Sequence, residues 1–152
     1  MTRTPQRGFA DIEFEARTAG AQALMAEQGL AGLLLLNEAD VRYFSGFHTL
    51  FWQSPTRPWF LFVPPEGKPI AIIPEIGADL MRRTWLDDIR TWSAPAPWDD
   101  GISLLTELLS PLAAQQSGYE LKAFIHRFTL SPGHLRASSN APMCKRCLRY
   151  SL

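Results

Sequence analysis

Aromatic and polar side chains are interleaved in one segment of the sequence, residues 37–60. Interfaces and small-molecule pockets combine aromatic walls with a few polar groups in this way, whereas a core strand or helix seldom does. Arg57 precedes a proline, which favours an extended backbone from which its guanidinium could bind a carboxylate bidentately. The segment therefore predicts four pocket or interface residues: Phe47, His48, Trp52 and Arg57. The competing interpretation places Phe51, Trp59 and Phe60 in the core, and we adopt it for Phe60.

Catalytic chemistry is harder to find in the same region. Glu38 and Asp40 follow an apolar run, and paired carboxylates can perform acid–base work or bind a divalent metal. Capping of a short helical turn explains them more simply. Ser45 lacks the Gly-x-Ser-x-Gly elbow of a serine nucleophile, and the chain has no phosphate-binding or dinucleotide-binding glycine motif. The sequence therefore predicts no catalytic residue and no metal ligand.

Both cysteines, Cys144 and Cys147, form a CxxC pair near the end of the sequence. A structural zinc site needs four ligands, and the nearby histidines, His126 and His134, both precede the pair. We therefore interpret the cysteines as exposed thiols of a tail rather than as a metal or redox site. The absence of cysteine from the rest of the chain suits a reducing cytoplasm.

Composition excludes several classes of partner. The 152 residues include 15 basic and 15 acidic side chains, so the overall charge does not draw the chain to nucleic acid or to an anionic membrane. The N-terminus has no apolar core of a signal peptide, and the longest aliphatic run is far below the roughly 20 residues that a membrane span requires. We expect a cytoplasmic protein that contacts neither nucleic acid nor membrane.

Helical and strand patterns alternate along the chain and predict a single α/β domain. The sheet is expected to be mixed but mostly parallel, flanked by helices, with a hairpin at "PPEGK". Asp11 is expected to cap the first helix. Helices are predicted at 12–29, 75–85 and 101–116 with a helical turn at 38–44, and strands at 30–37, 59–64, 69–74, 88–92 and 118–121. Ile76 and Leu80 are expected to face inward in the second helix, and Pro111 is expected to kink or interrupt the third.

The chain divides into three parts by this pattern. Residues 1–10 are expected to form a flexible arm, and residues 11–121 the folded domain. Residues 122–152 are basic, contain no Asp or Glu, and have poor periodicity. We interpret them as a tail, with truncation or a frameshift as the hypothesis for its unusual composition.

The stretch "ADVRYFSGF", after a buried strand that ends at Asn37, resembles the N-terminal domain of the creatinase, prolidase and aminopeptidase P family. The opening helix, the hairpin "WFLFVPPEGKPIAIIPE", the segment "GADLMRRTW" and "GYEL" extend the resemblance over roughly residues 9–121. It implies an α/β domain with a mixed sheet in a ribonuclease H-like arrangement.

The resemblance also implies a function. Family members carry catalysis in a C-terminal pita-bread domain, where metallopeptidase members hold divalent metal such as Mn, Co or Zn. This chain is expected to bind none, to have no peptidase activity itself, and to form a homo-oligomer or to pair with a catalytic domain. The loop with Phe47, His48, Trp52 and Arg57 would then wall a partner's active-site pocket. The alternatives are an accessory subunit of a split Xaa-Pro peptidase-like hydrolase, or a dipeptide-binding module that uses loop 47–59.

Overall fold

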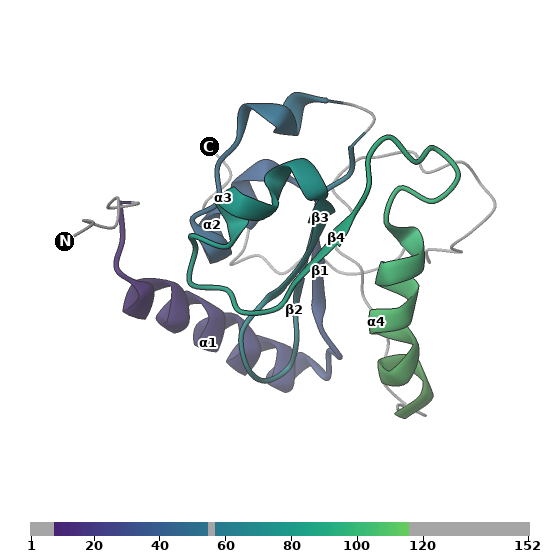
Figure 1. Ribbon diagram of the computed structural model, residues 1–152. Coiled ribbons are helices and arrows are strands. Elements are labelled where there is room, and N and C mark those ends of the chain that lie inside the picture. Colours follow the sequence, from purple (N-terminus) through teal and green to yellow (C-terminus); the bar gives the residue numbers. More distant parts are fainter. Residues whose placement is uncertain (1–7, 55–56, 116–152) are drawn as a thin grey trace.

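The computed structural model describes residues 8–54 and 57–115, and these form a three-layer α/β/α arrangement (Figure 1). Helices α1, α2 and α3 lie on one side of the sheet and α4 on the other, which confirms the predicted α/β class. The elements in chain order are α1 (Asp11–Gln28), β1 (Leu33–Leu35), α2 (Glu38–Ser45), the 3-10 helix η1 (Leu50–Gln53), β2 (Phe60–Val63), β3 (Ile70–Pro74), the 3-10 helix η2 (Glu75–Gly77), α3 (Ala78–Met81), β4 (Ile89–Trp92) and α4 (Ile102–Gln115).

The sheet of the described residues has the strand order β1-β2-β3-β4 and is mixed, as predicted. The β2–β3 hairpin is antiparallel, and β1 also pairs antiparallel with β2, with Leu34 opposite Phe62. Only β3 and β4 run parallel, with Ile72 opposite Arg90. The prediction of a mostly parallel sheet is therefore wrong for this part of the chain, because the long connection from β1 to β2 returns the chain in the opposite direction.

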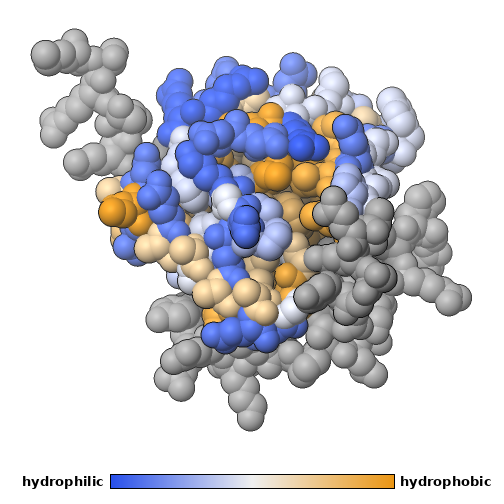
Figure 2. Space-filling model, turned by 90° about the horizontal axis from the view of Figure 1, so that it is seen from below, coloured by the Kyte–Doolittle hydropathy of each residue, from blue (hydrophilic) through white to orange (hydrophobic). Residues whose placement is uncertain are grey.

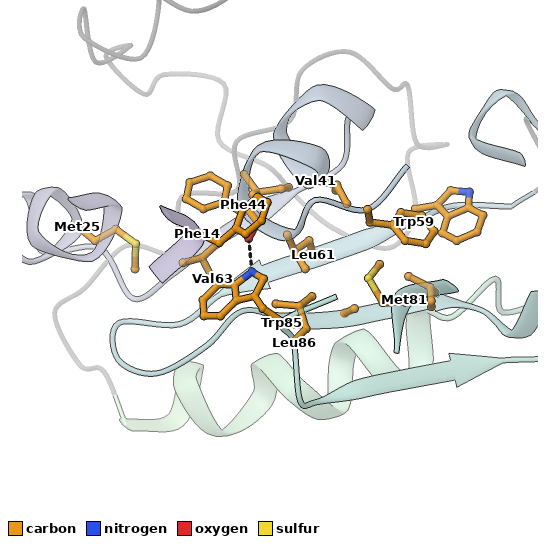
Figure 3. Packing of buried hydrophobic residues seen from close by; sticks show 14 residues of the cluster. Phe14, Met25, Val41, Phe44, Trp59, Leu61, Val63, Met81, Trp85 and Leu86 are labelled. Atoms are coloured by element: carbon orange, nitrogen blue, oxygen red, sulfur yellow. Dashed lines mark hydrogen bonds between the residues drawn. The ribbon is translucent and has the colours of Figure 1, made fainter. Parts of the chain in front are cut away.

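Alternate residues of the strands build two separate cores. Leu35, Leu61 and Ile73 point to the side of α1–α3, where most of the large buried side chains gather (Figure 3). Leu34 and Ile72 point to the other side and pack under α4. Successive side chains of a strand point to opposite faces of the sheet. Because both faces of this sheet are covered, both sets of side chains are apolar, and the strands therefore appear in the sequence as continuous apolar runs.

Helix α1 buries one stripe and exposes the rest. Phe14, Thr18 and Met25 are buried, while Figure 2, which views the molecule from the side where α1 lies, shows hydrophilic residues mixed with weakly hydrophobic ones. The helix ends at Gly29, whose positive φ of 62° is the left-handed conformation expected of a glycine there. Asp11 is not the cap that the sequence predicted, because it is already the first helical residue and Ala10 takes the cap position without a side-chain bond.

Helix α2 begins and ends where the sequence indicates. The Asn37 side chain accepts a hydrogen bond from the Asp40 backbone N–H at 2.8 Å, and Gly46 ends the helix with a φ of 72°. A Cβ atom at Gly46 would lie 2.8 Å from the Phe14 ring, so the turn also needs glycine for space. The cap is therefore Asn37 rather than Glu38 or Asp40, and the Asp40 carboxylate in turn accepts a hydrogen bond from the Asn37 side-chain amide.

Two further expectations differ from the structure. The helix predicted over 75–85 is divided into η2 and the short α3, and Ile76, expected to point inward, is exposed. Thr84 Oγ1 donates to the Met81 carbonyl, a local bond that competes with helix continuation. Helix α4 continues through Pro111 to Gln115. The strand predicted at 118–121, the tail and both cysteines lie outside the described residues, as do residues 1–7 of the predicted arm.

Candidate functional site

A stack of aromatic rings anchors the aromatic segment to the domain. The Trp52 ring stacks on Trp59 with ring centroids 5.6 Å apart, and the tilted Phe47 ring lies with its centroid 5.4 Å from that of Trp59. The Cβ position of Gly77 would fall 2.4 Å from the Trp59 ring, so only a glycine allows η2 to come this close. Thr49 caps η1 by accepting a hydrogen bond from Phe51 N–H at 3.2 Å. Because Trp59 belongs to the main core, the stacked Trp52 holds η1 in a defined position.

Of the predicted site residues, Phe47 is the one that the structure corrects. Its side chain is 1% exposed and belongs to the main core, so it offers no surface to a ligand or partner. The physical reason is the turn before it. Gly46 in the left-handed conformation reverses the chain, and Ser45 Oγ accepts a hydrogen bond from Phe47 N–H at 3.0 Å, which fixes Phe47 where its ring enters the core.

His48, Trp52 and Arg57 reach the surface but do not converge on one point. His48 Nε2 lies 3.6 Å from Glu38 Oε1, at the side of α2. Trp52 is half-buried against Trp59. Arg57 is half-buried, and its side chain has no ion-pair partner among the described residues. Their proposed role in binding stays a prediction.

The structure adds an apolar surface that sequence reasoning missed. Leu50 and Phe51 of η1 are 82% and 46% exposed, and Ile76 of η2 is 51% exposed. Trp52 of η1 stacks on Trp59, and Trp59 lies against Gly77 of η2, so the two 3-10 helices contact the same ring. We call Leu50, Phe51 and Ile76 the η1/η2 surface. No sequence signal marked it, because Ile76 fits the inward face of the helix that was predicted there.

A groove of about 990 Å³ opens between the start of α1 and the outer side of α2. Its wall on the α1 side is Arg17, whose guanidinium lies 4.3 Å from the Phe9 ring centroid and 4.6 Å from that of Tyr43. Glu38, Arg42 and His48 also line the groove. Sequence reasoning did not identify this groove, because its residues come from two helices whose contact depends on the tertiary fold.

Within residues 8–54 and 57–115, no group of three or more His, Cys, Asp or Glu side chains could hold a metal ion. Ionisable groups with displaced pKa values lie instead at the start of α4. Hydrogen bonds from the Ser103 side chain and backbone lower the pKa of Asp99, while burial and the neighbouring Asp99 charge raise the pKa of Asp100. In the same described residues, no helix is long and apolar enough to cross a membrane.

The fold is similar to that of dipeptidases and prolidases. Dipeptidase PepE from Mycobacterium ulcerans matches with a TM-score of 0.55 at 24% identity, over 67% of this chain and 27% of that one. Prolidase from Thermococcus sibiricus matches with a TM-score of 0.54 at 21% identity, over 65% of this chain and 25% of that one. This chain thus spans about a quarter of either enzyme's length.

A shorter relative aligns over more of its own length. The N-terminal domain of Xaa-Pro dipeptidase from Lactobacillus brevis matches with a TM-score of 0.51 at 18% identity, over 62% of this chain and 67% of that one. No curated protein sequence matches. The model of the creatinase/prolidase N-terminal domain matches residues 17–133, well over half of the sequence. This match covers α1 from Arg17, the sheet and α4, and the chain therefore belongs to the creatinase/prolidase N-terminal domain family.

Proposed function

We propose that this domain is a non-catalytic binding and assembly module that forms oligomers and contributes to the wall of a partner's active-site pocket. The observation that carries the proposal is the η1/η2 surface. Leu50, at 82% exposure, lies beside Phe51 on a loop whose base is locked by stacked tryptophans. Neighbouring exposed apolar side chains on a fixed support are typical of surfaces that another protein covers.

The rigid anchor matters for this role. A loop that must order on binding loses part of the contact energy to that ordering, about 0.5–1.5 kcal/mol for each immobilised side chain. Here Thr49 caps η1 and Trp52 is already stacked on Trp59, so this cost is met by folding. A preformed apolar loop is suited to closing a neighbouring pocket against water.

The similar structures indicate the class of enzyme whose active-site pocket the module would wall. The similar structures are dipeptidases, a prolidase and the N-terminal domain of an Xaa-Pro dipeptidase, and this chain aligns with about a quarter of the two enzymes given above. We infer that the module serves an Xaa-Pro peptidase-like hydrolase. The described residues hold no group suited to a metal, so a divalent metal would belong to the catalytic domain that the module contacts.

Sedimentation velocity of the full chain over a range of concentrations tests the assembly role. We expect a monomer–dimer equilibrium that Leu50→Ser weakens about tenfold or more, the effect of removing an interface anchor. Trp98→Ser is the matched control, because Trp98 is 84% exposed but lies in the loop before α4. A monomer at every concentration, or equal weakening by both variants, would reject self-assembly through the η1/η2 surface.

Hydrolysis of Xaa-Pro dipeptides by the purified chain, with manganese or cobalt added, tests the non-catalytic part of the proposal. We expect no turnover above background. Metal-dependent turnover that follows the protein through purification would contradict it. Addition of a separate catalytic polypeptide distinguishes the second candidate, an accessory subunit of a split hydrolase, since that subunit should restore or raise turnover only in the mixture.

A third candidate is a dipeptide-binding module that uses loop 47–59. It is favoured by one observation: Trp52 and Arg57 are both partly exposed, and Arg57 has no ion-pair partner in the described part of the chain. Isothermal titration with proline-containing dipeptides should then show binding that Trp52→Ala and Arg57→Ala both abolish. Unchanged affinity in the two variants would eliminate this candidate.

A further inference from the structure

The groove between α1 and α2 has the composition of a ligand site, independently of the proposed function. Its aromatic side is held together by Arg17, which contacts Phe9, Phe14 and Tyr43 through its guanidinium face. Phe9 and Tyr43 remain 58% and 44% exposed, so both rings present surface to a molecule in the groove. Rings that are stacked on a fixed partner can contact an apolar body with little further loss of rotamer freedom.

Arg17 itself is not available to bind a ligand. Its Nε and Nη2 atoms each lie 3.1 Å from Glu13 Oε1, and its Nη1 donates to the Tyr43 carbonyl at 3.0 Å. Its side chain is only 13% exposed. We assign Arg17 as a positioning residue, which holds the two rings in place while its own charge is compensated.

Arg42 is the other arginine that lines the groove. It lies one helical turn after Glu38, a spacing at which the two side chains ordinarily pair. Glu38 is instead directed to His48, 3.6 Å away, and no ion pair of Arg42 exists among the described residues. Arg42 is exposed and lines the same groove as the two rings. The groove is therefore lined by two exposed aromatic rings, by the Arg42 guanidinium, which has no ion pair in the described part of the chain, and by the Glu38 carboxylate, whose neighbour is His48.

We propose that this groove binds a carboxylate carried on an aromatic or apolar body, with Arg42 as the partner of the carboxylate and with Phe9 and Tyr43 as the contacts of the body. An arginine guanidinium presents paired N–H donors that match the two oxygens of a carboxylate. The site belongs to α1 and α2 and is distinct from the η1/η2 surface, although His48 lies at its edge.

A matched pair of probes tests the charge requirement on the full chain. 3-Phenylpropionate and 3-phenylpropionamide have the same aromatic body, and only the first carries a carboxylate. We expect titration followed by ¹⁵N-resolved NMR to show binding of the acid at least about tenfold tighter than the amide, the loss expected for a charge-assisted hydrogen bond. The perturbed signals should come from Phe9, Arg42, Tyr43 and His48. Equal affinities, or perturbations centred on Trp98 or Ile76, would overturn the proposal.

Two variants test the role of Arg42 in binding the carboxylate. Arg42→Gln should weaken binding of 3-phenylpropionate about tenfold and leave the amide unchanged. Arg83→Gln is the control, because Arg83 is also an exposed arginine without an ion pair in the described residues but does not line the groove. Equal weakening in both variants would show general charge attraction and refute the site. Should Arg42→Gln fail to fold, the acid–amide comparison on the unaltered chain still decides.

Discussion

The hydrogen bond between Trp85 and α2 makes the sharpest prediction about stability. Trp85 Nε1 donates to the Phe44 carbonyl at 2.8 Å, in the buried centre of the main core (Figure 3). Phe44 lies in the last turn of α2, where a carbonyl has no N–H partner within its own helix. Replacement of Trp85 by phenylalanine keeps an aromatic ring in the core but removes this donor.

The loss of stability expected for Trp85→Phe has two parts. A buried carbonyl left without a donor costs about 1–3 kcal/mol. The smaller ring leaves a cavity that costs about 1–2 kcal/mol, a fraction of what full truncation to alanine costs. Trp92→Phe should cost no more than the second part, because Trp92 is equally buried, at 6% exposure against 7% for Trp85, and the Nε1 that the change removes has no partner among the described residues. We therefore expect Trp85→Phe to lose at least about 1 kcal/mol more than Trp92→Phe.

Urea unfolding of the full chain, followed by far-ultraviolet circular dichroism, measures both free energies of unfolding. Their difference is large enough to resolve, since a domain of this size has a total stability of about 5–15 kcal/mol. The two variants should have the same denaturant slope as the unaltered chain, so that the comparison concerns stability rather than compactness. Equal losses in Trp85→Phe and Trp92→Phe would refute the assignment of this hydrogen bond as a stabilising contact.

Two further pairs of variants follow from the structure. Gly46→Ala should destabilise by about 1 kcal/mol more than Gly67→Ala, measured by thermal unfolding, because both have positive φ but only Gly46 lacks space for a Cβ atom. Asp99→Ala should lower the Tm at pH 7, since the hydrogen bonds from Ser103 depress the pKa of Asp99, and that loss should vanish as the pH falls below the ordinary value of 3.8. Asp100→Asn should raise the Tm at pH 7, because burial and Asp99 raise the pKa of Asp100, and the gain should disappear as the pH falls to about 3.8. The same sign of pH dependence in both aspartate variants would contradict this account.

Much of the fold could be predicted because local patterns and tertiary structure agree. The apolar runs became strands covered on both faces, and Gly29 and Gly46 end helices where a left-handed residue is required. Strand direction could not be predicted in the same way. The turn "PPEGK" indicates a hairpin by itself, but nothing in the long segment before β2 tells whether it returns parallel or antiparallel to β1.

The site was less predictable, for a reason visible in its residues. Composition identified the aromatic segment but could not separate its core side from its surface side. Phe47 enters the core because of the turn at Gly46, whereas Leu50 faces outward because a single 3-10 turn can bury only part of its residues. The groove could not be predicted from the sequence for a different reason. Arg17 and Arg42 line the same groove only because α1 packs on α2.

The end of α2 shows how distant residues determine where the aromatic segment starts. Three carbonyls of its last turn each accept a hydrogen bond: Arg42 from Gly46 N–H, Tyr43 from Arg17 Nη1, and Phe44 from Trp85 Nε1. Two of these donors are 26 and 41 residues away in sequence from the carbonyls that they reach, so no local sequence pattern could predict these hydrogen bonds. Because α1 and the core hold the helix end from both sides, the chain leaves α2 in one direction. The loop that follows is then positioned by the domain itself, which is what a surface that recognises a partner without reordering requires.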